Sequence, residues 1–79
     1  MHVISQKRIN EAKQEYPDCE SALDGWLRIV KKNTFKNFAE LKEAFNSVDK
    51  VDDFYIFNIG GNKIRLIASI HFNTEKIYI

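Results

Sequence analysis

The stretch from Lys63 to Asn73 alternates between apolar and mostly polar side chains, and it constrains the fold more than any other feature of the chain. A period of two is that of a β-strand, whose successive side chains point to opposite faces of a sheet. The residues of the apolar side are Ile64, Leu66, Ala68, Ile70 and Phe72. The other side carries Lys63, Arg65, Ile67, Ser69, His71 and Asn73. Such a pattern is typical of an antiparallel sheet with one face on a core and the other face in water.

Three further strands and one turn fit the same sheet. The aromatic and β-branched run 54–59 is expected to form a strand. Residues 60–62, two glycines and an asparagine, are expected to form the tight turn after it, because they tolerate positive φ at little cost. Residues 76–79 start another strand, and the weak alternation of residues 1–4 predicts a short one at the beginning of the chain.

Helical spacing dominates the first half of the chain. Its strongest stripe, at i, i+3, i+4, i+7 and i+11, consists of Cys19, Ala22, Leu23, Trp26 and Val30. Asp18 is the predicted N-cap of this helix, and an earlier helix is expected between an N-cap at Ser5 and a stop at Pro17. A third helix is predicted to begin at Asn37, since Asn37 and Glu40 have the spacing of a capping box.

The length of 79 residues suits one domain. Cys19 is the single cysteine, which excludes an intrachain disulfide and a cysteine-based zinc cage. We interpret it as a small buried side chain rather than a nucleophile, because no histidine is near it in the sequence. No apolar run approaches the roughly 20 residues of a membrane span. The first residues also lack the order of a secretory signal, so we expect a soluble cytoplasmic protein.

The sequence contains no standard motif for phosphate loops, metal sites or serine nucleophiles. Cations nevertheless gather in a chain whose formal net charge is only +1. Basic residues are concentrated between positions 28 and 36 and again in the last third, and if these segments meet in space they form a patch suited to a polyanion. The alternative is that both segments are ordinary solvated faces.

The polar side of the predicted strand 63–73 is where chemistry is most plausible. An arginine such as Arg65 can bind a phosphate through two donors, and a histidine such as His71 can carry a proton. The alternative reading is structural. In it, Arg65 pairs with Asp52 or Asp53 on the neighbouring strand, and His71 is a half-exposed sheet residue.

Several stretches carry a family resemblance. The most distinctive is the run 57–67, Phe-Asn-Ile-Gly-Gly-Asn-Lys-Ile-Arg-Leu-Ile. The others are residues 1–5 with Lys7-Arg8, Trp26 with 29–32, 38–42 with Phe45, 70–72, and 77–79. In these stretches the chain resembles the HigB family of type II toxins, the RelE-like messenger-RNA interferases.

The resemblance implies a RelE-like α+β fold, with N-terminal helices packed on one face of a twisted antiparallel β-sheet and RNA on the other face. It implies a ribosome-dependent endoribonuclease that cleaves mRNA and inhibits translation without a metal or another cofactor. The implied partners are mRNA on the ribosome and a HigA-like helix-turn-helix antitoxin. The resemblance implies that operator DNA is bound only through this antitoxin.

The resemblance also points to individual residues. Arg65 occupies the strand position of a catalytic arginine in RelE-like toxins, so it is expected to bind the scissile phosphate while the neighbouring 2′-OH attacks. Lys63 and His71 are further catalytic candidates on the same face. The expected RNA-binding residues are Lys31, Lys32, Lys36 and Asn62.

In this family a further strand end carries a Thr-His-x-x-Tyr-type motif, and the sequence given stops at Ile79 before such a motif. The expectation is therefore a single RelE-like domain over residues 1–79 that is truncated at its C-terminus. The alternative function is a truncated, non-cleaving module that only binds the antitoxin or the ribosome. An unrelated small RNA-binding or interaction domain is a third hypothesis.

Overall fold

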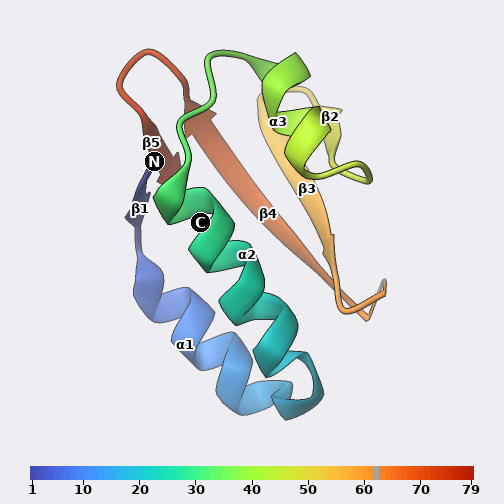
Figure 1. Ribbon diagram of the computed structural model, residues 1–79. Coiled ribbons are helices and arrows are strands. Elements are labelled where there is room, and N and C mark those ends of the chain that lie inside the picture. The colour runs from blue at the N-terminus through green and yellow to red at the C-terminus, as the bar shows by residue number, and fades with distance from the viewer. Residues whose placement is uncertain (62) are drawn as a thin grey trace.

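The computed structural model describes residues 1–61 and 63–79, which form an α+β fold (Figure 1). The helices are α1 (Gln6–Glu15), the short 3₁₀ helix η1 (Pro17–Cys19), α2 (Glu20–Lys32) and α3 (Phe38–Ala44). The strands are β1 (His2–Ile4), β2 (Asp49–Val51), β3 (Phe54–Ile59), β4 (Ile64–His71) and β5 (Lys76–Tyr78). The helices thus come first and most strands last, as the periodicity predicts.

The strands form one sheet in the order β1-β5-β4-β3-β2. Neighbouring strands are antiparallel except for β1 and β5, which are parallel, so the sheet is mixed rather than wholly antiparallel. Strands β2 to β5 follow one another through turns, which gives antiparallel pairs. β1 precedes the helices in the chain, so a long connection separates it from β5. A connection of this length allows the two strands to run parallel.

The helix starts differ in detail from the sequence predictions. Ser5 is the N-cap of α1, but its backbone is left-handed (φ 69°) and its side chain makes no capping hydrogen bond. The prediction of Asp18 as the N-cap of α2 is wrong, because the 3₁₀ turn η1 extends through this residue and moves the N-cap to Cys19.

The capping box of α3 is half confirmed. The backbone N–H of Glu40 donates to Asn37 Oδ1 over 3.0 Å, as predicted. The carboxylate of Glu40 accepts from the backbone N–H of Lys36 over 2.9 Å, one residue before the donor that a capping box would use.

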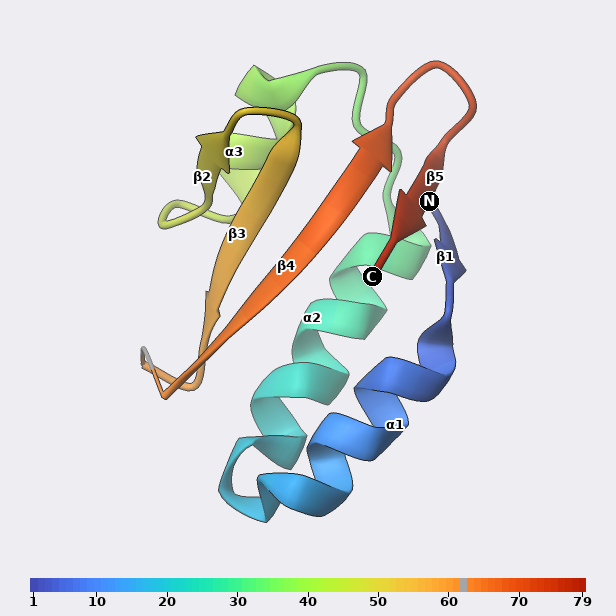
Figure 2. The ribbon, with the colours of Figure 1, turned by 180° about the vertical axis from the view of Figure 1, so that it is seen from behind.

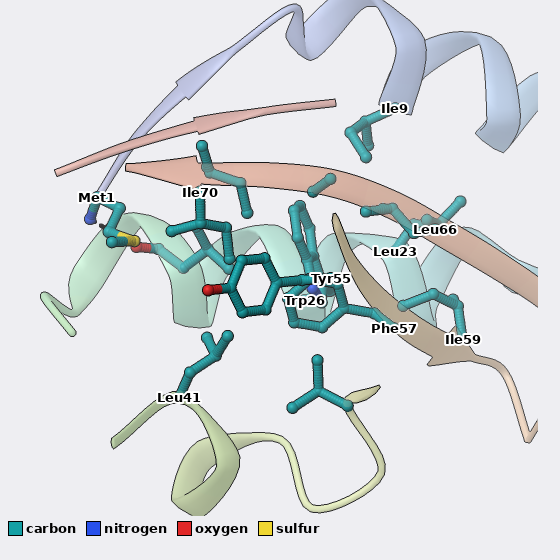
Figure 3. Packing of buried hydrophobic residues seen from close by; sticks show 14 of the residues in the cluster. Met1, Ile9, Leu23, Trp26, Leu41, Tyr55, Phe57, Ile59, Leu66 and Ile70 are labelled. Atoms are coloured by element: carbon teal, nitrogen blue, oxygen red, sulfur yellow. Dashed lines mark hydrogen bonds between the residues drawn. The ribbon is translucent and has the colours of Figure 1, made fainter. Parts of the chain in front are cut away.

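The core lies between α2 and the inner face of the sheet (Figure 3). Trp26 of α2 meets Phe57 of β3 edge to face, with ring centroids 5.3 Å apart, and Phe45 contacts both rings. Leu23 and Ile77 are completely buried in the same cluster. Burial of this apolar surface, worth about 25 cal/mol per Å², is what holds the helices on the sheet.

Polar contacts tie the helices to each other and to β1. The amino group of Met1 donates to the carbonyl oxygens of Val30 (2.8 Å) and Asn33 (2.6 Å), which fixes β1 at the C-terminal end of α2. Lys13 Nζ lies 2.7 Å from Asp24 Oδ1 and so links α1 to α2. The hydrogen bond to this carboxylate raises the pKa of Lys13 above its ordinary value.

Within residues 1–61 and 63–79, no helix has both the length and the apolar surface needed to cross a bilayer.

Candidate nucleic-acid interface

The outer face of β4 is open. Arg65, Ile67 and His71 are exposed there, while the alternate residues Leu66, Ala68 and Ile70 are buried against the helices. Figure 2 views the sheet from this side, where the described helices leave the surfaces of β3 and β4 uncovered. The sequence prediction of one covered face and one wet face is confirmed.

Strand register arranges the outer face in rows across the sheet. Asn58 of β3 lies beside Arg65, and Ile56 lies beside Ile67. Farther along β4, Ser69 is paired with Tyr78 of β5. His71 is paired with Lys76, and Lys76 in turn with His2 of β1. The rings of His71 and Tyr78 meet edge to face at 5.2 Å, a neighbour that the alternation of side chains in one strand does not predict.

Beside the first half of β4 lies a groove of about 480 Å³ that brings cations together. Arg8 of α1, Lys63 of the β3–β4 turn and Arg65 of β4 all line it, and all three are exposed. Tyr16 and apolar side chains, including Ile67 and Ile79, complete the walls. We refer to Arg8, Lys63 and Arg65 as the groove cations.

The structural alternative for Arg65 is not supported. Among the described residues no carboxylate lies within salt-bridge distance of its guanidinium. Asp52 and Asp53 precede β3, whereas Arg65 is paired with Asn58 near the other end of that strand. Arg65 therefore keeps its donors available for an anion in the groove.

The structure does not bring His71 to the groove cations. Arg65 and His71 share one face of β4 but are six positions apart, which at about 3.4 Å per residue separates them by about 20 Å. This distance exceeds what the two side chains can bridge, so they cannot contact one phosphate together. Of the three catalytic candidates, only Lys63 and Arg65 line the same groove.

The lysines predicted to bind RNA lie elsewhere. Lys31 and Lys32 are exposed in the last turn of α2, and Lys36 is exposed in the following loop. This is the end of α2 to which Met1 is hydrogen-bonded, so it adjoins the beginning of β1 and the corner formed by His2 and Lys76. These three lysines therefore do not line the groove with Arg8, Lys63 and Arg65. Asn62, the fourth predicted RNA-binding residue, lies outside the described residues.

Cys19 is buried at the start of α2, in keeping with its interpretation as a small core side chain. Within the described part of the chain, no three His, Cys, Asp or Glu side chains gather in a way that could hold a metal ion.

Sequence reasoning missed Arg8 and Tyr16 in the groove. Their positions with Ala12, at i, i+4 and i+8, place them along one side of α1, and this spacing was a usable signal. The sequence does not show which strand this side of α1 approaches.

Comparison with known proteins gives concordant results. The model of a family described as the RelE-like toxic component of a toxin–antitoxin system, the HigB toxin, matches residues 19–79. The chain is 37% identical over 82 aligned residues to the mRNA interferase toxin HigB of Escherichia coli strain K12. This alignment covers 100% of the chain and 79% of that protein. It is 30% identical to the mRNA interferase HigB of Escherichia coli O6:H1, with 100% and 80% covered.

Proposed function

The chain belongs to the HigB family, the RelE-like toxic components of toxin–antitoxin systems, and from this premise we propose that it is an endoribonuclease that cleaves mRNA in translating ribosomes. Its homologues carry the name mRNA interferase. The observation that carries the proposal is the convergence of Arg8, Lys63 and Arg65 on one groove beside an open sheet face.

The proposed reaction is attack of a ribose 2′-OH on the adjacent phosphate, which forms a 2′,3′-cyclic phosphate while the bond from phosphorus to the 5′-oxygen of the next nucleotide breaks. The 2′-OH gives up its proton to water, and the departing 5′-oxygen takes one up from water. Negative charge grows on the phosphate oxygens during this attack, and preorganised cations stabilise it most effectively where water is scarce. Arg65 is assigned to the scissile phosphate because a planar guanidinium can donate two parallel hydrogen bonds to it. Lys63 adds a second positive charge in the same groove.

Cleavage without a metal ion is part of the proposal. A divalent cation would neutralise negative charge at the phosphate, and in this proposal the basic side chains that line the groove do so instead.

His71 is assigned a separate place on the RNA. It lies too far along β4 to act on the phosphate that Arg65 holds, so we assign it to another nucleotide of the same strand, next to Lys76. Lys31, Lys32 and Lys36 are assigned to sequence-independent contacts with the RNA backbone of the message or the ribosome. These assignments make the toxin a protein of the cytoplasm, where translating ribosomes are found.

The proposed protein partner is an antitoxin of the helix-turn-helix, HigA-like type. Such a partner would bind the toxin and the operator DNA, and the toxin itself would contact no DNA.

Expression of the chain from a tightly regulated promoter tests the proposal. We expect growth arrest together with cleavage of mRNA, and loss of both with Arg65→Ala. The matched control is Arg28→Ala, which removes an exposed arginine of α2 that does not line the groove. Retained arrest and cleavage in Arg65→Ala would contradict the role of Arg65. Binding of ribosomes or antitoxin by the parent chain without any cleavage would support the non-cleaving alternative instead.

A further inference from the structure

Two exposed aromatic side chains stand in one row of the outer face. The register that pairs Tyr55 with Ala68 places Phe54 beside Ser69, and Ser69 is paired with Tyr78 on its other side. Phe54 is 52% exposed and Tyr78 is 39% exposed. Because neighbouring strands are about 4.8 Å apart, the two aromatic residues rise from strands about 10 Å apart, with only a small serine between them. We call Phe54, Ser69 and Tyr78 the aromatic row.

Apolar surface continues from this row toward the groove. Ile67, the next outward residue of β4, is exposed, and its neighbour Ile56 is partly exposed. Scattered exposed apolar residues need no explanation, but a contiguous set on an open sheet face marks a site of interaction. The open face therefore presents apolar surface between its basic ends.

The distribution of charged residues around this face indicates which kind of ligand binds there. Arg65 and Lys63 lie at one end of β4, and His71 and Lys76 lie at the other. On the far side of the row, Asp52 and Asp53 directly precede Phe54. An anionic chain is therefore favoured over β4 and β5 and disfavoured over the turn before β3. Cations along the path of the backbone and aromatic faces beside it are what single-stranded nucleic acid requires.

We propose that Phe54 and Tyr78 stack on bases of a single-stranded RNA whose phosphates follow β4 from Arg65 to His71. The inference rests on the proposed function and names how its substrate is held. In this arrangement the sugar–phosphate chain lies over β4 and β5, and at least one base turns toward β3, where Phe54 presents its ring. Stacking is tolerant of sequence because every base has a π-face, so the row supplies affinity and placement rather than recognition of particular bases.

The test is the binding of a fluorescent single-stranded RNA, compared with a strand of equal length that lacks its bases. Phe54→Ala and Tyr78→Ala should each weaken binding of the RNA by about five- to a hundredfold, which corresponds to the removal of one base–aromatic stack. Phe54→Trp and Tyr78→Phe should bind as the parent chain does. Binding of the base-free strand, and the salt dependence of binding, should stay unchanged in all four variants, since phosphate contacts remain.

Two control variants separate stacking from general apolar contact. Val51 is 50% exposed and paired with Phe54, so Val51→Ala removes a comparable exposed apolar side chain that cannot stack, and RNA binding should not change. Phe54→Leu keeps an apolar side chain but removes the π-face, and it should bind RNA as poorly as Phe54→Ala.

The proposal is overturned if Phe54→Ala binds RNA like the parent chain, or if the base-free strand loses affinity equally. It is also overturned if Phe54→Leu retains RNA binding while Phe54→Ala instead loses binding of an antitoxin, because the face would then be a protein interface. Failure of the proposed function looks different, since the parent chain would then cleave no RNA. If the parent chain cleaves RNA and Arg65→Ala does not, the proposed function stands. Unchanged RNA binding by Phe54→Ala would then refute only the stacking proposal.

Discussion

Gly60 packs its backbone against the buried sulfur of Cys19, and a β-carbon added to Gly60 would lie 3.0 Å from that sulfur. The contact joins the beginning of the β3–β4 turn to the N-cap of α2. Lys63 follows three residues later, so the contact helps to place the groove cations. A side chain at position 60 would have to displace the sulfur, the turn or the helix start.

The first prediction compares two glycines that share a backbone conformation. Gly60 and Gly61 have φ of 62° and 65°, so an alanine at either position carries the left-handed penalty of roughly 1–2 kcal/mol. Only at Gly60 does the new methyl group meet another atom, because nothing lies within 4 Å of a β-carbon on Gly61. Gly60→Ala should therefore lower the free energy of unfolding by about 1 kcal/mol more than Gly61→Ala. Urea unfolding followed by the fluorescence of Trp26, the single tryptophan, measures the difference.

The double variant Cys19→Ala/Gly60→Ala provides the control for this prediction. Removing the sulfur creates the space that the methyl group needs, so the two substitutions should cost less together than the sum of their separate effects. Equal losses in Gly60→Ala and Gly61→Ala would mean that the contact with Cys19 imposes no steric cost.

The second prediction concerns the distance between Arg65 and His71. Substitutions more than about 10 Å apart with no shared partner have additive effects. The losses of activation free energy in Arg65→Ala and His71→Ala should therefore add within about 0.5 kcal/mol in the double variant. Lys63→Ala and Arg65→Ala should not add, because Lys63 and Arg65 line one groove. The measurement is kcat/KM for mRNA cleavage in a purified translation system.

The outcome that contradicts this prediction is a coupling of more than about 1 kcal/mol between Arg65 and His71. Such coupling would mean that the RNA or a moving segment brings the two residues to the same phosphate. His71→Gln serves as a companion variant, because glutamine can donate a hydrogen bond but cannot act as a base at neutral pH.

The buried and open faces of the main strands were predictable from the sequence because only one face of the sheet is buried, whereas β2 and the parallel pairing of β1 with β5 were not predicted. In β4 the buried and open positions follow the alternation of side chains directly. The same alternation places Arg65 and His71 on one face of β4 but does not show how far apart they lie, since a period of two identifies the face of a residue and not its distance along the strand. Arg8 and Tyr16 were missed for another reason. Their place in the groove depends on the packing of α1 beside β4, a long-range relationship that local spacing does not encode.

The third prediction concerns the lysines at the end of α2. Lys31 and Lys32 are exposed and lie away from the groove, so Lys31→Gln/Lys32→Gln should weaken binding of every single-stranded RNA to a similar extent. The slope of log K against log salt should become shallower by about 0.7 for each phosphate that the variant no longer neutralises. Lys50→Gln is the control, because Lys50 is exposed on edge strand β2 near Asp49 and Asp52. An unchanged slope in the double variant would show that neither lysine binds the RNA backbone.

The fourth prediction tests the N-cap of α3. Because this helix has only seven residues, its stability depends on the hydrogen bond at its N-terminus. Asn37→Ala removes the acceptor for the backbone N–H of Glu40 and should lower the free energy of unfolding by about 1 kcal/mol. Asn37→Asp keeps an acceptor oxygen at the same position and adds a negative charge that the helix N-terminus favours, so it should retain the stability of the parent chain.

Asn46→Ala is the control for this prediction, because Asn46 is an exposed residue just beyond the end of α3. Leu41 is buried and Phe45 contacts Trp26, so a frayed α3 should also change the fluorescence of Trp26 before global unfolding. If Asn37→Ala and Asn46→Ala are equally stable, the hydrogen bond to Glu40 contributes nothing and packing alone holds the helix.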